Sequence, residues 1–278
     1  MMFDLIKYSS IQLRDIKEPA TPKGPDFSLC GLVKHDLAGN ILSFRSPKHC
    51  PKNSYSKAIY ERRFKSMEFY TRLSNERVMP DQKWRHRTIF ARTWAYCGPW
   101  FTGKLYQQTI SINIIEPETV NNNISFFHPR AFESTILRLL TSSYSHNDES
   151  NQHIAPVDWK PLTWLPTPGA EFSITEPRGR PDSAKQVVIL PFSDHHLLKI
   201  SFSYGRNFWN ETDLPDDELV STLPLIKLRN SIIDSIHLEL SPESQAQLDK
   251  ATAECSGVKL TETFPPIDWS ATKPNTEL

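Results

Sequence analysis

The stretch LYQQTISINII, residues 105–115, alternates apolar and polar side chains over most of its length. Its apolar set is Tyr106, Ile110, Ile112 and Ile114. The intervening polar set is Gln107, Thr109, Ser111 and Asn113. A strand places successive side chains on opposite faces, so this pattern predicts one buried face and one wet face. Strands of this kind are typical of antiparallel sheets.

The neighbouring stretches predict further antiparallel strands. Residues 88–96 carry Phe90, Trp94 and Tyr96 on one face, and the turn at residues 98–103 joins them to the strand just described. Hairpins are also expected at residues 32–44 and 187–204. Residues 124–127 and 236–240 suggest short strands. Six prolines between residues 156 and 181 predict an irregular segment.

The sequence predicts four helices, three of them from the amphipathic spacing of apolar residues and one from its capping residues. Two begin with a proline near the first position, over residues 129–144 and from residue 222 onward. A third begins at Ser241, which is a good N-cap, and ends near Gly257. The fourth prediction, over residues 56–75, is based on the spacing of Ile59, Phe64, Met67, Tyr70 and Leu73. The chain is therefore expected to be α+β, with mostly antiparallel sheet and flanking amphipathic helices.

Length and composition favour one folded unit. The chain has 278 residues, and its 15 Phe, 8 Tyr and 7 Trp supply enough bulk to close a core. We expect an extended N-terminal segment over residues 1–25 and a single α+β unit over residues 26–278. The polar stretch 145–152 is the place where two subdomains could divide.

Several classes of function have no support in the composition. Basic and acidic residues balance at 32 each, so the chain lacks the overall charge that nucleic-acid binding favours. Only 9 glycines are present, and none forms a phosphate-binding loop. The four cysteines lack zinc-site spacing, although Cys30 and Cys50 could form a disulfide across a hairpin or remain reduced. We therefore expect no cofactor, no metal and no nucleic-acid partner.

The chain shows no apolar run near the 18 residues needed to cross a bilayer. The apolar stretch at residues 1–6 is interrupted by Asp4 and is too short for a secretory signal. As written, the protein is expected to be cytoplasmic. It would be periplasmic if an upstream signal or anchor is missing.

The run Ser193-Asp194-His195-His196 is the strongest candidate for chemistry. It could provide a nucleophile, an acid and a base for a small hydrolase. However, adjacent residues of a strand point to opposite faces, so His195 and His196 cannot jointly hold one metal. We expect a structural role instead, in which the turn residue Asp194 bonds a half-buried histidine, and no catalytic residues.

Two aromatic segments are candidates for binding a protein partner. Trp100 and Phe101 lie in the predicted turn after Tyr96, where burial is not guaranteed. The second segment combines possible anchors with an acidic loop that could meet a basic partner. Its candidate residues are Arg206, Phe208, Trp209, Asp213, Asp216, Asp217 and Glu218. The alternative is that Phe208 and Trp209 cap the sheet and the acids form a solvated loop.

The chain resembles bacterial proteins encoded in type VI secretion toxin clusters, among which immunity proteins occur. The resemblance spans roughly residues 26–248 and is carried by the segments 125–130, 187–202, 231–236 and 240–244. It implies a non-enzymatic protein that binds and neutralises one cognate toxin. It carries over no binding residue. The alternatives are a small hydrolase using Asp194, His195 or His196, and a scaffold component of a secretion or envelope assembly.

Overall fold

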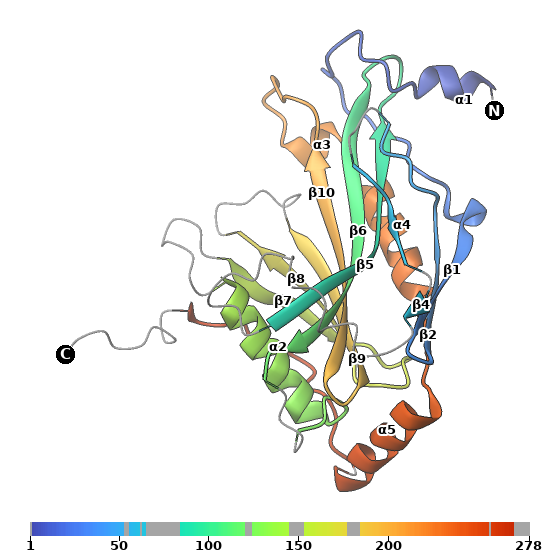
Figure 1. Cartoon of the computed structure of the whole chain (residues 1–278). Helices are drawn as coiled ribbons and strands as arrows, with labels where there is room; N and C mark the ends of the chain where they lie inside the picture. Colours follow the sequence, from blue (N-terminus) through green and yellow to red (C-terminus); the bar gives the residue numbers. More distant parts are fainter. Residues whose placement is uncertain are drawn as a thin grey trace.

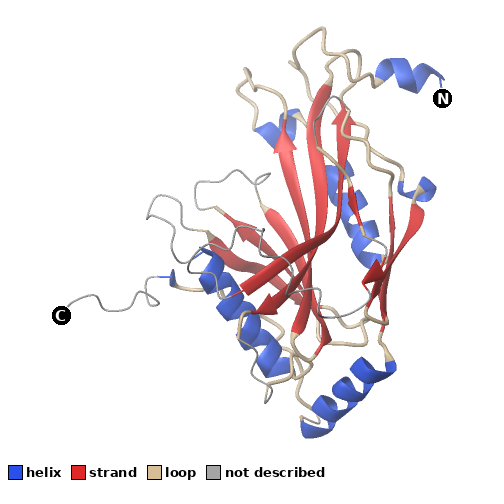
Figure 2. Cartoon of the chain, viewed as in Figure 1, coloured by secondary structure: helices blue, strands red, loops and turns tan. Residues whose placement is uncertain are grey.

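The computed structural model describes residues 2–52, 56–61, 63–64, 84–119, 124–144, 153–176, 184–255 and 257–269. The fold is α+β, as the alternation predicted (Figures 1 and 2). The helices are α1 (Met2–Lys7), α2 (Pro129–Tyr144), α3 (Asp216–Leu219), α4 (Leu223–Asp234) and α5 (Pro242–Glu254), with a 3-10 turn at Phe27–Leu29. The expected subdomain boundary at residues 145–152 lies outside the described residues.

The larger sheet has seven antiparallel strands in the order β3-β5-β6-β10-β9-β8-β7. These strands are β3 (Ile59–Tyr60), β5 (Trp84–Cys97), β6 (Lys104–Pro117), β7 (Ile154–Pro161), β8 (Ala170–Thr175), β9 (Lys185–Ser193) and β10 (His196–Arg206). Ten consecutive residues of β10 pair with β6, from Leu197 opposite Ile115 to Arg206 opposite Tyr106. Strands from both halves of the chain therefore share one sheet.

The smaller sheet has four strands in the order β11-β2-β1-β4. They are β1 (Gly31–Leu37), β2 (Asn40–Ser46), β4 (Arg63–Phe64) and β11 (His237–Glu239). The predicted hairpin at residues 32–44 is confirmed, and Ala38 and Gly39 form its turn at positive φ. All four cysteines are free thiols in the structure.

Apolar side chains form two clusters on opposite faces of the larger sheet. One cluster joins alternate residues of β5, β6, β9 and β10 to α4 and the smaller sheet. The other joins the opposite face to α2 and to the C-terminal segment through Phe264, Ile267 and Trp269. The larger sheet is therefore the middle layer, with α2 on one side and α4 on the other (Figure 1). No helix among the described residues is long and apolar enough to cross a membrane.

Three local predictions were wrong. Within the described part of residues 56–75 the chain forms β3 and β4 rather than a helix; the remainder of that prediction lies outside the described residues. Residues 124–127 form a turn before α2, not a strand. The proline-rich segment contains β7 and β8. Prolines are tolerated in β7 because it is an edge strand with interrupted pairing.

The N-terminal segment is extended over most of its length, but it begins with α1. It crosses the end of the larger sheet. The main-chain N–H of Leu13 donates to Phe101 O at 2.9 Å, and Lys23 and Cys97 exchange two main-chain hydrogen bonds. Ala20 N donates to Leu219 O at 2.9 Å. The segment thereby connects the β5–β6 turn to α3.

Candidate protein-binding end and groove

The two aromatic segments predicted as binding sites lie at the same end of the larger sheet. The β5–β6 turn is next to the end of β10, because β10 pairs with β6 and Asn207 N donates to Leu105 O at 2.9 Å. We call the turn 98–103, the loop 206–218 and the segment 2–13 together the apical end; it is uppermost in Figure 1.

Arg206 and Phe208 do not provide exposed anchors, contrary to the sequence prediction. Phe208 is buried edge-to-face against Tyr106, with ring centroids 5.5 Å apart. Arg206 lies over the Phe208 ring and forms an ion pair with Asp216. Asn210 donates to the second carboxylate oxygen of Asp216 at 2.9 Å. Arg206, Phe208 and Asp216 therefore stabilise the loop through contacts within the protein.

The remaining predicted residues of this loop face outward. Trp209 is 85% exposed, and Asp213, Asp217 and Glu218 are exposed in the same loop. The side chain of Asn210 accepts from the Thr212 N–H and donates to Leu214 O, which holds the loop in a defined shape. A large apolar ring and three carboxylates are thus exposed on one loop.

Trp100 and Phe101 adopt a backbone conformation that bulky residues rarely adopt. Both have positive φ, 51° for Trp100 and 67° for Phe101. The turn is held by Trp100 N donating to Lys7 O at 2.6 Å and by Thr102 Oγ1 donating to Pro99 O at 2.9 Å. Trp100 remains 41% exposed, and Phe3 packs against it edge-to-face at 5.7 Å. Phe101 is half-buried.

The N-terminal segment adds apolar surface that the sequence analysis did not include in the site. Its exposed side chains are Phe3, Leu5, Ile6, Ile11 and Leu13. The apolar run at residues 1–6 was visible in the sequence, but its position beside Trp100 depends on contacts between distant residues. The apical end therefore exposes several large apolar side chains together, which is uncommon on a surface that binds nothing.

A groove runs beside the apical end, between α4 and the strands β7 to β10. Its first lobe encloses about 510 Å³ and extends from Asp217 to Arg229, over Tyr204 of β10. Its second lobe encloses about 450 Å³ and continues to Asp234. Both lobes are lined by Asp158, Ser173, Gln186 and Arg229, so they form one continuous groove.

The predicted histidine cluster is arranged differently from expectation. The side chains of Ser193 and His196 share a hydrogen bond of 2.6 Å at Nδ1, so serine rather than Asp194 bonds the histidine. His196 Nε2 lies 3.8 Å from Glu116 Oε1. Burial lowers the pKa of His196 to about 4, with a smaller contribution from His195, and burial raises the pKa of Glu116. At neutral pH the imidazole is uncharged.

His195 and Asp194 do not join this arrangement. The rings of His195 and Phe126 lie edge-to-face, with centroids 6.1 Å apart, on the α2 side of the sheet. The ring of His196 packs against Phe192 on the α4 side. The expectation of opposite faces is confirmed. The main chain of Asp194 accepts from Phe126 N and donates to Gln247, which connects the turn to α5. Among the described residues no cluster of three His, Cys, Asp or Glu could hold a metal.

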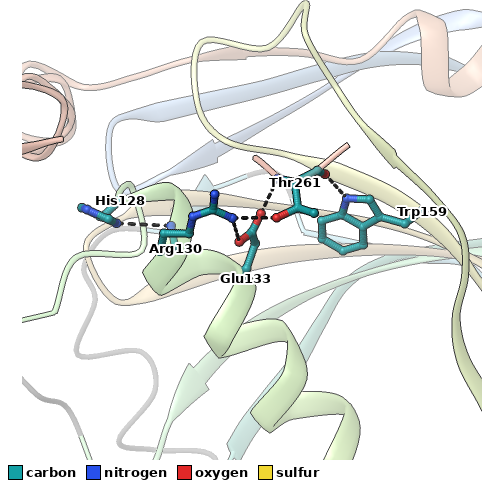
Figure 3. A network of polar contacts seen from close by, with 5 residues as sticks. All are labelled: His128, Arg130, Glu133, Trp159 and Thr261. Carbon is teal, nitrogen blue, oxygen red and sulfur yellow. Dashed lines mark hydrogen bonds and ion pairs between the residues drawn. The ribbon is translucent and has the colours of Figure 1, made fainter. Parts of the chain in front are cut away.

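A polar network secures the C-terminal segment rather than forming a site (Figure 3). Glu133 of α2 is buried, forms an ion pair with Arg130 at 2.7 Å and accepts from Thr261 N. Arg130 also donates to Thr261 Oγ1 at 2.6 Å, and Trp159 Nε1 donates to Thr261 O at 2.8 Å. These contacts hold the segment after α5 against α2 and β7.

Comparison with known proteins gives little further information. No family model matches the chain, and no curated protein matches it. One solved structure is found, the immunity protein TplEi of the type VI secretion system of Pseudomonas aeruginosa, complexed with a peptide named "L". The identity is 8%, with 83% of this chain and 98% of that chain covered, and the TM-score is 0.19. A TM-score this low supports no argument about fold or function.

Proposed function

We propose that this protein is a non-enzymatic binding protein that neutralises a cognate secreted bacterial toxin by covering it with the apical end. The observation that carries the proposal is the joint exposure of Trp209, Trp100 and the N-terminal apolar side chains at one end of the sheet. Interfaces are centred on such aromatic anchors, and nearby charges favour encounter with a partner of opposite sign.

The strained turn gives the proposal further support. Residues in sparsely populated backbone regions cost free energy and persist where the surrounding structure determines them. Here Trp100 and Phe101 are held in that region by the N-terminal segment, and the result is an outward aromatic ring. A structure that only needed to close a hairpin could use glycine at these positions.

The test is neutralisation of the product of the neighbouring gene. That gene is expressed in a bacterial host with and without this protein, and growth and co-purification are measured. We expect rescue of growth by the wild type, and at least about tenfold weaker binding by the Trp100→Ala/Trp209→Ala variant. Trp164→Ala is the matched control, because Trp164 is 44% exposed in the β7–β8 connection, away from the apical end. Wild-type binding by the double variant, or an equal loss in the control, would contradict the proposal.

A small hydrolase is the second candidate, because Ser193, His196 and Glu116 follow one another in space. Three observations weaken it: serine bonds Nδ1 of a histidine only three residues away, Glu116 lies beyond hydrogen-bond distance, and both Ser193 and His196 are buried. Neither residue lines the groove. Covalent labelling of Ser193 by a fluorophosphonate, lost in Ser193→Ala, would favour the hydrolase.

A further inference from the structure

The groove beside the apical end has the length of a short peptide. Its α4 wall is formed by residues at helical spacing from Thr222 to Asp234. Twelve residues of helix are about 18 Å long at 1.5 Å per residue. An extended chain rises about 3.3 Å per residue, so the groove accommodates five to six residues.

The floor of the second lobe is polar because α4 does not cover this part of the sheet. Alternation along β8 sends Phe172 and Ile174 to the α2 side, and leaves Glu171 and Ser173 on the groove side. Ser173 donates to Gln186 at 2.8 Å, and Gln186 donates to Glu171 at 2.9 Å. The floor is thus fixed by its own hydrogen bonds, as a preformed binding surface requires.

The groove carries an excess of negative charge. Five carboxylates line its two lobes; Asp216 is paired with Arg206, and the other four compare with the two cationic side chains of Lys160 and Arg229. Within the described part of the chain, the carboxylates of Asp158, Asp217 and Asp234 form no ion pair and no side-chain hydrogen bond. Arg229 donates to Tyr204 and Asn230, so it does not neutralise them. Apolar contact is available beside the acids from Leu225 and Ile226.

Asp158 reaches this groove through an irregularity of β7. Its φ is +55°, and pairing with β8 shifts between Val157 and Lys160. Such bulges re-aim a side chain and also protect an edge strand from pairing with another chain. The same irregularity therefore places a carboxylate in the groove and makes β7 a poor edge for the addition of a strand.

We propose that the groove receives a cationic, extended segment of a partner protein, with Arg or Lys side chains separated by apolar residues. The carboxylates of Asp158, Asp217 and Asp234 meet the cations, and Tyr204, Leu225 and Ile226 contact the apolar residues. The proposal rests on the proposed function in one respect: the segment belongs to the neutralised toxin.

The test uses fluorescent hexapeptides and the intact protein, with binding followed by fluorescence anisotropy. One peptide alternates arginine and leucine; in two matched peptides citrulline or glutamate replaces arginine. We expect the arginine peptide to bind at least about tenfold more tightly than the citrulline peptide, and to weaken as salt is raised. Similar binding of all three peptides would overturn the proposal.

Variants locate the binding. Asp158→Asn/Asp234→Asn, at two groove acids outside the apical end, should weaken binding of the arginine peptide at least about tenfold. The control Glu243→Gln/Glu254→Gln changes net charge equally at two exposed acids that lie outside both the groove lining and the apical end, and should bind as the wild type does. Equal losses in both double variants would show attraction by net charge alone and would overturn the proposal.

Neutralisation measured on the same variants separates the two proposals. Loss of peptide binding together with weaker toxin binding supports the groove as part of the toxin interface. Intact toxin binding by the groove variant overturns the assignment of the segment to the toxin, while the proposed function stands. Peptide binding without any neutralisation by the wild type overturns the proposed function and leaves the cationic site in place.

Discussion

At the residue scale, Phe208 and Trp209 show how neighbours in sequence take opposite roles. Phe208 packs against Tyr106 and is buried, whereas Trp209 is exposed. Both were candidate anchors in the sequence, because two adjacent aromatic residues give no indication of which one the sheet will cover. Substitution of Phe208 should therefore affect mainly stability, and substitution of Trp209 should affect mainly partner binding.

We predict that Phe208→Ala lowers the free energy of unfolding by about 3 kcal/mol or more, because it removes a buried ring and leaves a cavity. Trp209→Ala should change stability by less than about 0.5 kcal/mol and should weaken partner binding. Urea denaturation followed by circular dichroism measures the first effect, and co-purification with the toxin measures the second. A Trp209→Ala protein as unstable as Phe208→Ala would contradict the assignment.

His196 should make stability depend on pH below neutrality. Its pKa is about 4 in the folded protein and 6.5 in the unfolded chain, so between these values only the unfolded chain binds the proton. Stability therefore falls as pH falls from 6.5 to 4, by up to about 3 kcal/mol from this residue. The raised pKa of Glu116 acts in the opposite direction over part of this range.

The comparison of wild type with His196→Gln isolates the histidine, because Glu116 is present in both proteins. The free energy of unfolding is measured at pH 7 and pH 4.5. We expect a smaller decrease in the variant than in the wild type. Parallel decreases would show that His196 titrates normally.

At the scale of elements, the attachment of the C-terminal segment depends on α2. Glu133 forms an ion pair with Arg130 and accepts from the main chain of Thr261 in a buried position, next to the apolar contacts that the segment makes through Phe264, Ile267 and Trp269. The helix itself was predictable from its apolar spacing. Its partner was not, because Thr261 lies 128 residues further along the chain.

Glu133→Ala should cost about 1 to 3 kcal/mol, since it leaves buried donors without an acceptor. It should also speed amide hydrogen exchange in residues 258–264 more than in β6. Glu254→Ala, an exposed change at the end of α5, is the control and should leave both quantities unchanged. If amide hydrogen exchange after residue 257 is unchanged in Glu133→Ala, Glu133 does not hold the C-terminal segment against α2.

At the scale of the whole molecule, the long pairing of β6 with β10 unites the two halves of the chain. Fragments 1–148 and 153–278 each contain part of the larger sheet, and each would expose a long central strand if made alone. We predict that neither fragment unfolds cooperatively by itself, and that the two associate when expressed together. A cooperative thermal transition in either isolated fragment would show independent domains.

The sequence by itself determined the elements whose side chains repeat with a clear period. These include β5, β6 and β10, and the helices α2 and α4, because alternation and helical spacing reflect which face is buried. The β9 strand was predicted from a short, continuously apolar run instead. The sequence also indicated Trp100, Trp209 and the acidic loop as candidates for binding. Ser241 was recognised as an N-cap from chemistry that acts within one turn, and its side chain accepts from Ser244 N.

Only the tertiary structure decided the features that depend on distant residues. The pairing of β3 with β5 overrides the helical spacing of residues 56–64, and an edge position admits the prolines of β7. The apical end forms because the N-terminal segment bonds to a turn nearly 90 residues away, and the groove forms where α4 stops covering β8. Local patterns indicate which face of an element is buried. They do not indicate which other element packs against that face, because contacts between distant segments leave no period in the sequence.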